Sequence, residues 1–208
     1  MLHHFVINSP IIEIKLLRFY LYFWKKLTMK IILSILLCLS LASCTVYGVT
    51  NDYKKLSEKD QLMIVPLQSF EQTDSQHVYK INGQQLKSEL SKHPKSLVYI
   101  FTNGCTSQYC LPMSNYERFA KENNYKLFLV MEGYSHLQKT TEQRSEAFRE
   151  PLYSIDNDFY NSWYSVRYHR LFENELRGIE KKAKPEWEGG LYFFNYDKLE
   201  KVTRDLPQ

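Results

Sequence analysis

The chain has 208 residues, a formal net charge of +4 and an aromatic content of 15%. The small positive charge is spread along the sequence and forms no basic cluster in a recognisable binding motif, so we expect no nucleic-acid partner. The apolar content of 44% indicates a folded protein and excludes a disordered tail.

An apolar run without charges follows Met29 and Lys30 and ends in Leu41-Ala42-Ser43-Cys44. A positive start and a short apolar run are typical of a signal peptide, and the run is too short to span a membrane comfortably. Its end resembles the lipobox of bacterial lipoproteins. That resemblance implies a signal peptide at 29–43, cleavage before Cys44, and lipidation of Cys44 (diacylation in that family) as the membrane anchor. An ordinary secretory signal or an uncleaved anchor, with Cys44 incidental, is the alternative.

Residues 1–28 fit a signal peptide poorly, because Glu13, Lys15 and Arg18 interrupt their apolar part. Our hypothesis is that Met29 is the natural start and that 1–28 is an over-extended reading frame. A long basic n-region ending in Lys25-Lys26 is the alternative. We expect a lipid-anchored membrane protein of the bacterial cell envelope, facing the periplasm or the exterior.

Residues 44–60 are polar and indicate a lipidated tether, which leaves 61–208 as one compact domain. The apolar and alternating runs predict strands at 61–67, 77–81, 97–101, 126–131 and 152–155, and a closing hairpin of 191–194 with 199–204. Helical spacing predicts helices at 84–92, after Pro112, at 135–149 and at 156–177, with a turn at Asn82-Gly83. The runs 97–101 and 126–131 show no polar alternation, which indicates a sheet covered on both faces.

The last of these helices is expected to bury an apolar stripe of Phe159, Trp163, Val166, either Leu171 or Phe172, and Leu176. Asp156-Asn157-Asp158 offers capping chemistry at its start, and Gly178 would stop it. Tyr160, Tyr164 and Tyr168 are expected either to pack at its rim or to line a partner-binding face.

The strand at 97–101 breaks at Thr102-Asn103-Gly104, and Cys105 and Cys110 follow. A cysteine at a helix start is favoured as a thiolate, because unpaired N–H groups and the helix dipole stabilise its charge. Five positions along a straight helix would separate the two Cα atoms by roughly 8–9 Å, beyond the usual reach of a disulfide of about 7 Å. A Cys105–Cys110 bond therefore requires Cys105 in the turn before the helix, or an unwound first turn.

The order of strands and helices from about His77, the cysteine at a strand–helix junction and the closing hairpin resemble the thioredoxin-like fold. This implies an α/β protein with a central mixed sheet and helices on both faces. It also implies a thiol-disulfide oxidoreductase in which Cys105 is the nucleophile and Cys110 the resolving thiol. The chain departs from that family in its Cys-x4-Cys spacing, in having Gly104 where a tryptophan is usual, and in having Gly189 at the position of the cis-proline.

The stretch from Thr102 to Cys110 also resembles peroxiredoxins that carry both cysteines on one helix. That resemblance implies a peroxidatic Cys105, a resolving Cys110 and a Thr102 that orients the peroxide. The prolines of that motif fall on Val98 and Asn103, and no arginine can be assigned to activate the cysteine.

Three functions therefore remain open. The first is a redox enzyme acting on envelope proteins with thiols or disulfides, the second a non-catalytic binding scaffold with a structural Cys105–Cys110 disulfide, and the third a thiol peroxidase. An exposed Cys105 at a helix N-terminus favours an enzyme, whereas a pair buried behind Trp187 or Tyr134 favours the scaffold. The histidines are scattered and no phosphate loop or zinc spacing is present, so we expect no metal and no cofactor.

Overall fold

The computed structural model describes Arg18, residues 20–32, Ser34, residues 47–105, Ser107 and residues 110–207. The chain divides into two units, Met1–Val46 and Tyr47–Gln208. In the first unit residues 20–32 are helical. Cys44, residues 35–43 of the expected signal peptide and residues 1–17 of the expected surplus segment lie outside the described residues. Within the described part of the chain, no helix has both the length and the apolar character needed to cross a membrane.

The second unit is built on a seven-stranded sheet in the order β1-β2-β5-β4-β3-β6-β7. The strands are β1 (Ile64–Pro66), β2 (Val78–Ile81), β3 (Ser96–Phe101), β4 (Lys126–Met131), β5 (Leu152–Ile155), β6 (Leu191–Asn195) and β7 (Lys198–Thr203). Every neighbouring pair from β1 to β3 is parallel, whereas β6 pairs antiparallel with β3 and with β7. β3 therefore lies where the parallel part of the sheet meets the closing hairpin.

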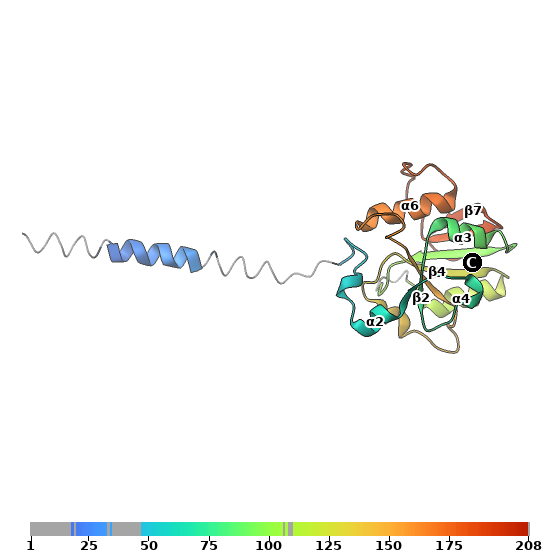
Figure 1. Ribbon diagram of the computed structural model, residues 1–208, viewed down its shortest axis with the longest axis horizontal. Coiled ribbons are helices and arrows are strands. Elements are labelled where there is room, and N and C mark those ends of the chain that lie inside the picture. The colour runs from blue at the N-terminus through green and yellow to red at the C-terminus, as the bar shows by residue number, and fades with distance from the viewer. Residues whose placement is uncertain are drawn as a thin grey trace, which may run out of the picture. The chain divides into compact units, whose positions relative to one another are not determined.

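Helices cover both faces of this sheet (Figure 1). They are α2 (Glu58–Leu62), α3 (Gly83–Leu90), α4 (Met113–Glu122), α5 (Leu137–Thr141) and α6 (Ser165–Arg177), with 3-10 turns η1 (Tyr53–Lys55) and η2 (Phe70–Gln72). α3 and α6 pack on the face that carries Val98 and Phe128, and α4 and α5 on the face that carries Leu97 and Leu127. The expected α/β class with a mixed, doubly covered sheet is confirmed. All members of both apolar clusters lie between Tyr53 and Leu206, so the second unit has a core of its own.

The Asn82-Gly83 pair begins a helix and is not a hairpin turn. The Asn82 side chain accepts a hydrogen bond from the Gln85 amide at 2.9 Å, and the Gln85 side chain accepts one from the Asn82 amide at 3.0 Å. This reciprocal cap satisfies two amides at the start of α3. Gly83 also permits α3 to approach α6, because a Cβ there would lie 2.7 Å from Glu175 Cβ.

Of the helix expected at 135–149, only the five residues of α5 are helical. His136 enters it in a left-handed conformation, with φ of 55°. After α5 the chain is irregular but anchored, since Phe148 is buried and the Arg144 guanidinium lies 4.7 Å from its ring centroid and donates to the Glu150 carbonyl. The sequence prediction was wrong because this segment is ordered by a buried aromatic and an arginine, not by a helical apolar stripe.

The helix expected at 156–177 begins only at Ser165. Asn161 has a φ of 46°, which interrupts any helix at that point. Asp156, Asn157 and Asp158 were expected to cap this helix, but they lie in the turns before it. There the Asp156 side chain accepts a hydrogen bond from the Asp158 amide. As a result Trp163 is 70% exposed and Val166 58% exposed, and the buried stripe of α6 is Tyr168, Phe172 and Leu176. Gly178 ends α6 with a φ of 68°, as predicted.

Residues 47–60 are not an extended tether. The Tyr134 amide donates to the Asn51 carbonyl at 2.8 Å, and the Asn51 side chain donates to Asn157 at 2.6 Å. Asp52 is 2% exposed and Tyr53 packs edge-on against the buried Tyr134 ring. The polar residues that suggested a linker form hydrogen bonds with residues far along the chain, and these bonds attach the segment to the domain.

Candidate functional site

The turn after β3 is fixed by a buried asparagine. Asn103 is 3% exposed, and its side-chain amide donates to the Gly133 carbonyl at 2.8 Å. Its carbonyl oxygen accepts the hydroxyl of Thr140, on α5, at 2.7 Å. Asn103 thus ties the chain leaving β3 to the chain leaving β4. The sequence indicates Asn103 as part of the break after this strand, but it does not predict these two side-chain hydrogen bonds.

Gly104 lets the turn lie directly against the segment after β4. Its φ is 67°, and a Cβ on it would lie 2.8 Å from His136 Cβ and 2.9 Å from Lys139 Cδ. A side chain at this position would therefore be strained in its backbone and blocked by its neighbours. The close approach also brings the stem of Lys139 beside the residue that precedes Cys105.

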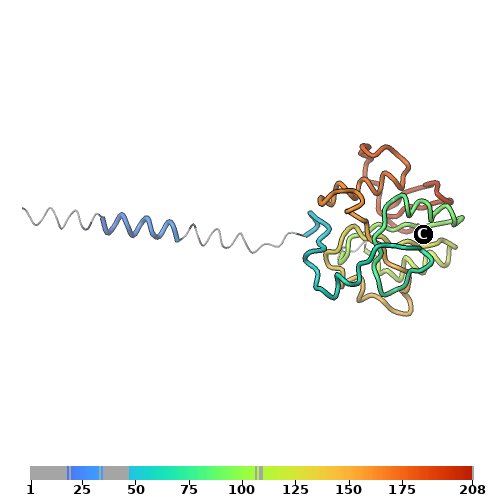
Figure 2. Tube along the Cα trace, viewed as in Figure 1, coloured from blue at the N-terminus to red at the C-terminus, as the bar shows by residue number. Residues whose placement is uncertain are grey.

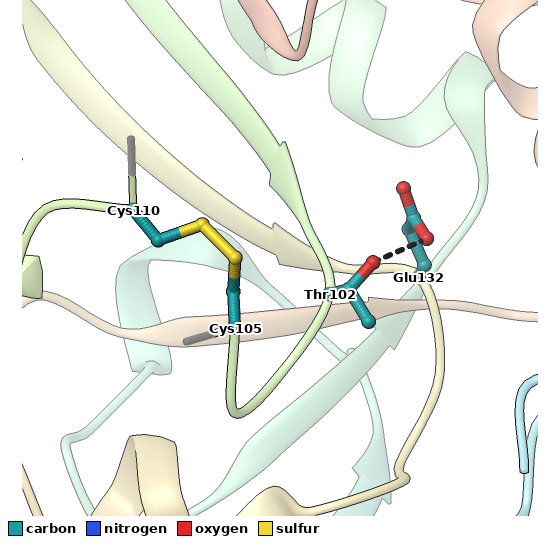
Figure 3. Close-up of a disulfide and its surroundings, with 4 residues drawn as sticks. All are labelled: Thr102, Cys105, Cys110 and Glu132. Carbon is teal, nitrogen blue, oxygen red and sulfur yellow. Dashed lines mark hydrogen bonds between the residues drawn. A yellow bond between two sulfur atoms is a disulfide. The ribbon is translucent and has the colours of Figure 1, made fainter. Parts of the chain in front are cut away.

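Cys105 and Cys110 form a disulfide with a Cα–Cα separation of 6.0 Å (Figure 3). Cys105 is exposed and Cys110 half-buried. The Cys110 amide donates to the Ser107 carbonyl at 2.9 Å, so the bridge closes a turn and not a helical segment. Both cysteines precede α4, which starts at Met113 after Pro112 as its N-cap residue.

The expectation that Cys105 sits at a helix start is therefore wrong, and the bridged alternative with an irregular turn is the one observed. A disulfide of this spacing cannot be accommodated in a straight helix, because the helical rise alone would hold the two Cα atoms too far apart. The first amide of α4, that of Met113, is instead satisfied by the Gln143 side chain at 2.9 Å. Cys105 therefore does not occupy the first turn of α4, where a helix dipole acts most strongly on a thiolate.

Thr102, the third candidate residue, does not face the sulfur atoms. Its hydroxyl donates to a Glu132 carboxylate oxygen at 2.8 Å, and Figure 3 shows the two side chains directed toward each other and away from the disulfide. Glu132 directly follows β4, so this contact joins the carboxyl ends of two neighbouring parallel strands. Ligand sites of open α/β sheets commonly lie at that edge.

A cleft of about 560 Å³ opens beside the disulfide. Both cysteines line it, together with Thr102, Glu132 and residues from α6 and from the chain around the closing hairpin. Its aromatic part includes Tyr99 and Tyr116, whose rings stack with centroids 4.1 Å apart. Burial, and then the contact with Tyr116, raises the pKa of the Tyr99 phenol, so Tyr99 is neutral at physiological pH. Trp187 also lines the cleft, 64% exposed, with the Arg204 guanidinium 4.8 Å from its ring centroid.

A polar cluster made of Glu132, His169 and Glu173 lines the same cleft. His169 Nε2 lies 3.6 Å from a Glu132 oxygen and 3.8 Å from a Glu173 oxygen. Glu173 also accepts the Tyr192 hydroxyl, and burial together with the Glu173 charge raises the pKa of Tyr192. In the sequence, only the spacing of four between His169 and Glu173 hints at this cluster. Among the residues described, no group of three or more potential ligands is arranged to hold a metal ion.

A second hollow, of about 330 Å³, lies against the disulfide and is also lined by both cysteines. Its wall includes Lys139 and Gln143 from the segment at α5, and Leu111 and Pro112 from the loop. The disulfide is thus accessible from two hollows. Lys139 supplies a cation near Cys105 that the sequence around the cysteine does not contain.

Gly189 lies at the position where the resemblance to thioredoxin-like proteins leads one to expect a cis-proline. Its φ is 146°, and a Cβ there would lie 2.0 Å from the Thr203 carbonyl oxygen. The close approach of the hairpin strands accounts for a glycine here. The next residue continues the sheet, since the Ile100 amide donates to the Gly190 carbonyl at 2.8 Å.

No protein-family model matches this chain, and neither the curated protein sequences nor the solved structures contain a detectable match to it.

Proposed function

We propose that this protein is a membrane-anchored, thioredoxin-like lipoprotein of the cell envelope that acts as a thiol-disulfide oxidoreductase through Cys105 and Cys110. The observation that carries the redox part is the exposed Cys105, bonded to Cys110 beside a cleft of about 560 Å³. A structural disulfide is usually protected from solvent and exchange, whereas an exchanging one must be accessible to a partner. The anchoring part rests on the lipobox-like sequence that ends at Cys44.

Three features support the thioredoxin-like assignment. The cysteine pair follows the central strand β3, which is joined by α4 to its parallel neighbour β4. The chain closes with an antiparallel hairpin, β6–β7, placed directly beside β3. Helices cover both faces of the sheet (Figure 1).

The exchange begins from the reduced protein. The Cys105 thiolate attacks one sulfur of a substrate disulfide, forms a mixed disulfide and releases the other substrate sulfur as a thiolate. The Cys110 thiolate then attacks Cys105 Sγ, forms the observed disulfide and releases the second substrate thiolate. Two electrons pass from the cysteine pair to the substrate, and the reverse sequence oxidises a substrate dithiol. Substrates are therefore exported proteins that carry cysteine pairs.

Lys139 is the group we assign to thiolate stabilisation, in place of the helix dipole. Its stem runs beside Gly104, and it lines the hollow that contacts both cysteines. A neighbouring ammonium favours the charged form of a thiol and lowers its pKa.

Trapping of the mixed disulfide tests the proposal. The Cys110→Ser variant keeps Cys105 but removes the resolving thiol, so an oxidised model protein with an exposed disulfide should accumulate as a covalent adduct. The matched variant Cys105→Ser should trap much less, because Cys110 is half-buried. Equal trapping by the two variants, or none by either, would contradict the assigned roles.

A binding scaffold with a structural disulfide is the second candidate, and one observation favours it. Both cysteines precede α4, so Cys105 does not occupy the helix-terminal position at which catalytic cysteines are usually activated. In that case the bond would mainly constrain the unfolded chain, by about 2 kcal/mol for so short a loop. The thiol peroxidase alternative gains no support from Thr102, whose hydroxyl donates to Glu132.

A further inference from the structure

An exposed apolar patch lies at the start of the second unit, apart from the disulfide cleft. We define the N-terminal aromatic patch as Tyr47, Val49, Trp163, Tyr164 and Val166. These side chains are between 43% and 70% exposed. Soluble domains rarely expose several large apolar side chains together without a binding role.

The two segments of the patch are held together by hydrogen bonds. The Ser165 amide donates to the Val49 carbonyl at 3.0 Å, and the Ser165 hydroxyl donates to the Gly48 carbonyl. The buried Asp52 accepts from the Gly48 amide at 2.7 Å, which fixes residues 48–52. Figure 2 shows residues 47–52 beside the chain that leads into α6. The patch is therefore a preformed surface and not a loose chain end.

The residue types suit a membrane interface. Tryptophan and tyrosine combine an apolar ring with a polar group and are enriched at the level of lipid headgroups. Trp163 and Tyr164 have ring centroids 5.9 Å apart, and Val166 lies in the first turn of α6, which begins directly after Tyr164. Two exposed cations accompany them: Arg167 follows Val166, and Lys54 lines a cleft that Trp163 also lines. Such cations would meet headgroup phosphates.

The position of the patch in the chain also points to a membrane interface. Tyr47 is the third residue after Cys44, and three residues can span at most about 11 Å. A lipid on Cys44 would therefore hold Tyr47 close to the headgroup layer. The hydrogen bonds from Ser165 to the Gly48 and Val49 carbonyls hold the rest of the patch near Tyr47, and therefore near the same surface.

We propose that the N-terminal aromatic patch inserts into the headgroup region of the bilayer that holds the anchor, and so sets the orientation of the domain. This inference rests on the anchoring part of the proposed function and is independent of its redox part. Disulfide chemistry in solution would be unchanged if the patch were inactive.

Single-tryptophan variants of residues 47–208, which have their own core, test this. Trp163 and Trp187 are the two tryptophans of that unit, both are exposed, and they line different clefts. The Trp187→Phe variant reports Trp163 alone, and the matched Trp163→Phe variant reports Trp187 alone. Each is held by an N-terminal hexahistidine segment on phosphatidylcholine vesicles that contain a nickel-chelating lipid and brominated phosphatidylcholine.

We expect the Trp163 emission to shift to shorter wavelength and to be quenched at least about threefold more strongly than that of Trp187, since interfacial tryptophan reaches the lipid. Val166→Asp in the Trp187→Phe background should lower the quenching of Trp163 to the level seen for Trp187. Equal quenching of the two tryptophans, or an unquenched Trp163, would overturn the proposal. A blue shift of Trp163 that grows with protein concentration without vesicles would also overturn it, because a second copy would then cover the patch. Incorporation of labelled fatty acid at Cys44 in cells tests the anchor separately.

Discussion

Replacing Asn103 by alanine should destabilise the domain through the loop that carries Cys105. The substitution removes the hydrogen bonds to the Gly133 carbonyl at 2.8 Å and from the Thr140 hydroxyl at 2.7 Å. Asn103 is 3% and Thr140 1% exposed, so water does not readily replace the lost partner. Each lost bond is worth about 1 kcal/mol, and a buried group left unsatisfied costs about 1–3 kcal/mol. We expect a loss of about 2–4 kcal/mol in the free energy of unfolding.

Urea unfolding of oxidised residues 47–208, followed by circular dichroism, measures this loss. Thr140→Val removes only one of the two bonds and should cost about 1–2 kcal/mol. The double variant should cost about 1 kcal/mol less than the sum of the two single variants, because both remove the same contact. A loss below about 0.5 kcal/mol for Asn103→Ala, or strict additivity, would refute the account of this turn.

Three further predictions concern single side chains. Burial alone would raise the pKa of Glu117, but hydrogen bonds from Lys121 and from the Arg149 and Glu150 amides outweigh it and lower that pKa. This stabilisation is present above the unfolded pKa of about 4.3 and is lost as the pH falls through the folded pKa. The difference between the free energies of unfolding at pH 7 and at pH 3 should therefore be smaller for Glu117→Gln than for the unsubstituted protein. Lys139→Met in the Cys110→Ser background should raise the pKa of Cys105, which would shift the pH profile of its alkylation rate to higher pH. Lys139→Arg keeps the positive charge and should leave the profile unchanged. An unchanged profile in Lys139→Met would show that Lys139 does not stabilise the Cys105 thiolate. Gly189→Ala should lower the melting temperature far more than Gly48→Ala. Both glycines have a positive φ, but only at position 189 would the added Cβ clash, with the Thr203 carbonyl. Equal losses in melting temperature would contradict this account.

The sequence predicted the sheet better than the helices. The apolar runs at 97–101 and 126–131 became β3 and β4 because a strand buried on both faces needs apolar residues at every position. The region before α6 was mispredicted because its capping residues also stabilise turns, and Asn161 adopts a left-handed conformation. The polar segment at 47–60 was mispredicted because hydrogen bonds to distant residues such as Asn157 are invisible to composition.

The candidate site was predicted only in its cysteines. Spacing alone showed that a Cys105–Cys110 bond needs an irregular turn, which is what the structure contains. Glu132, Lys139 and His169 come from three separate segments and meet the disulfide loop only through the sheet. No local pattern marks such residues, because their proximity depends on the order of the strands.

The redox midpoint of the Cys105–Cys110 pair tests the central claim most directly. Residues 47–208 are equilibrated in graded thiol-disulfide buffers, and the bond is quantified by the mass shift after alkylation. A working oxidoreductase predicts a midpoint between roughly −120 and −230 mV. A midpoint below about −300 mV would contradict the claim and identify the pair as a structural clip of a binding scaffold.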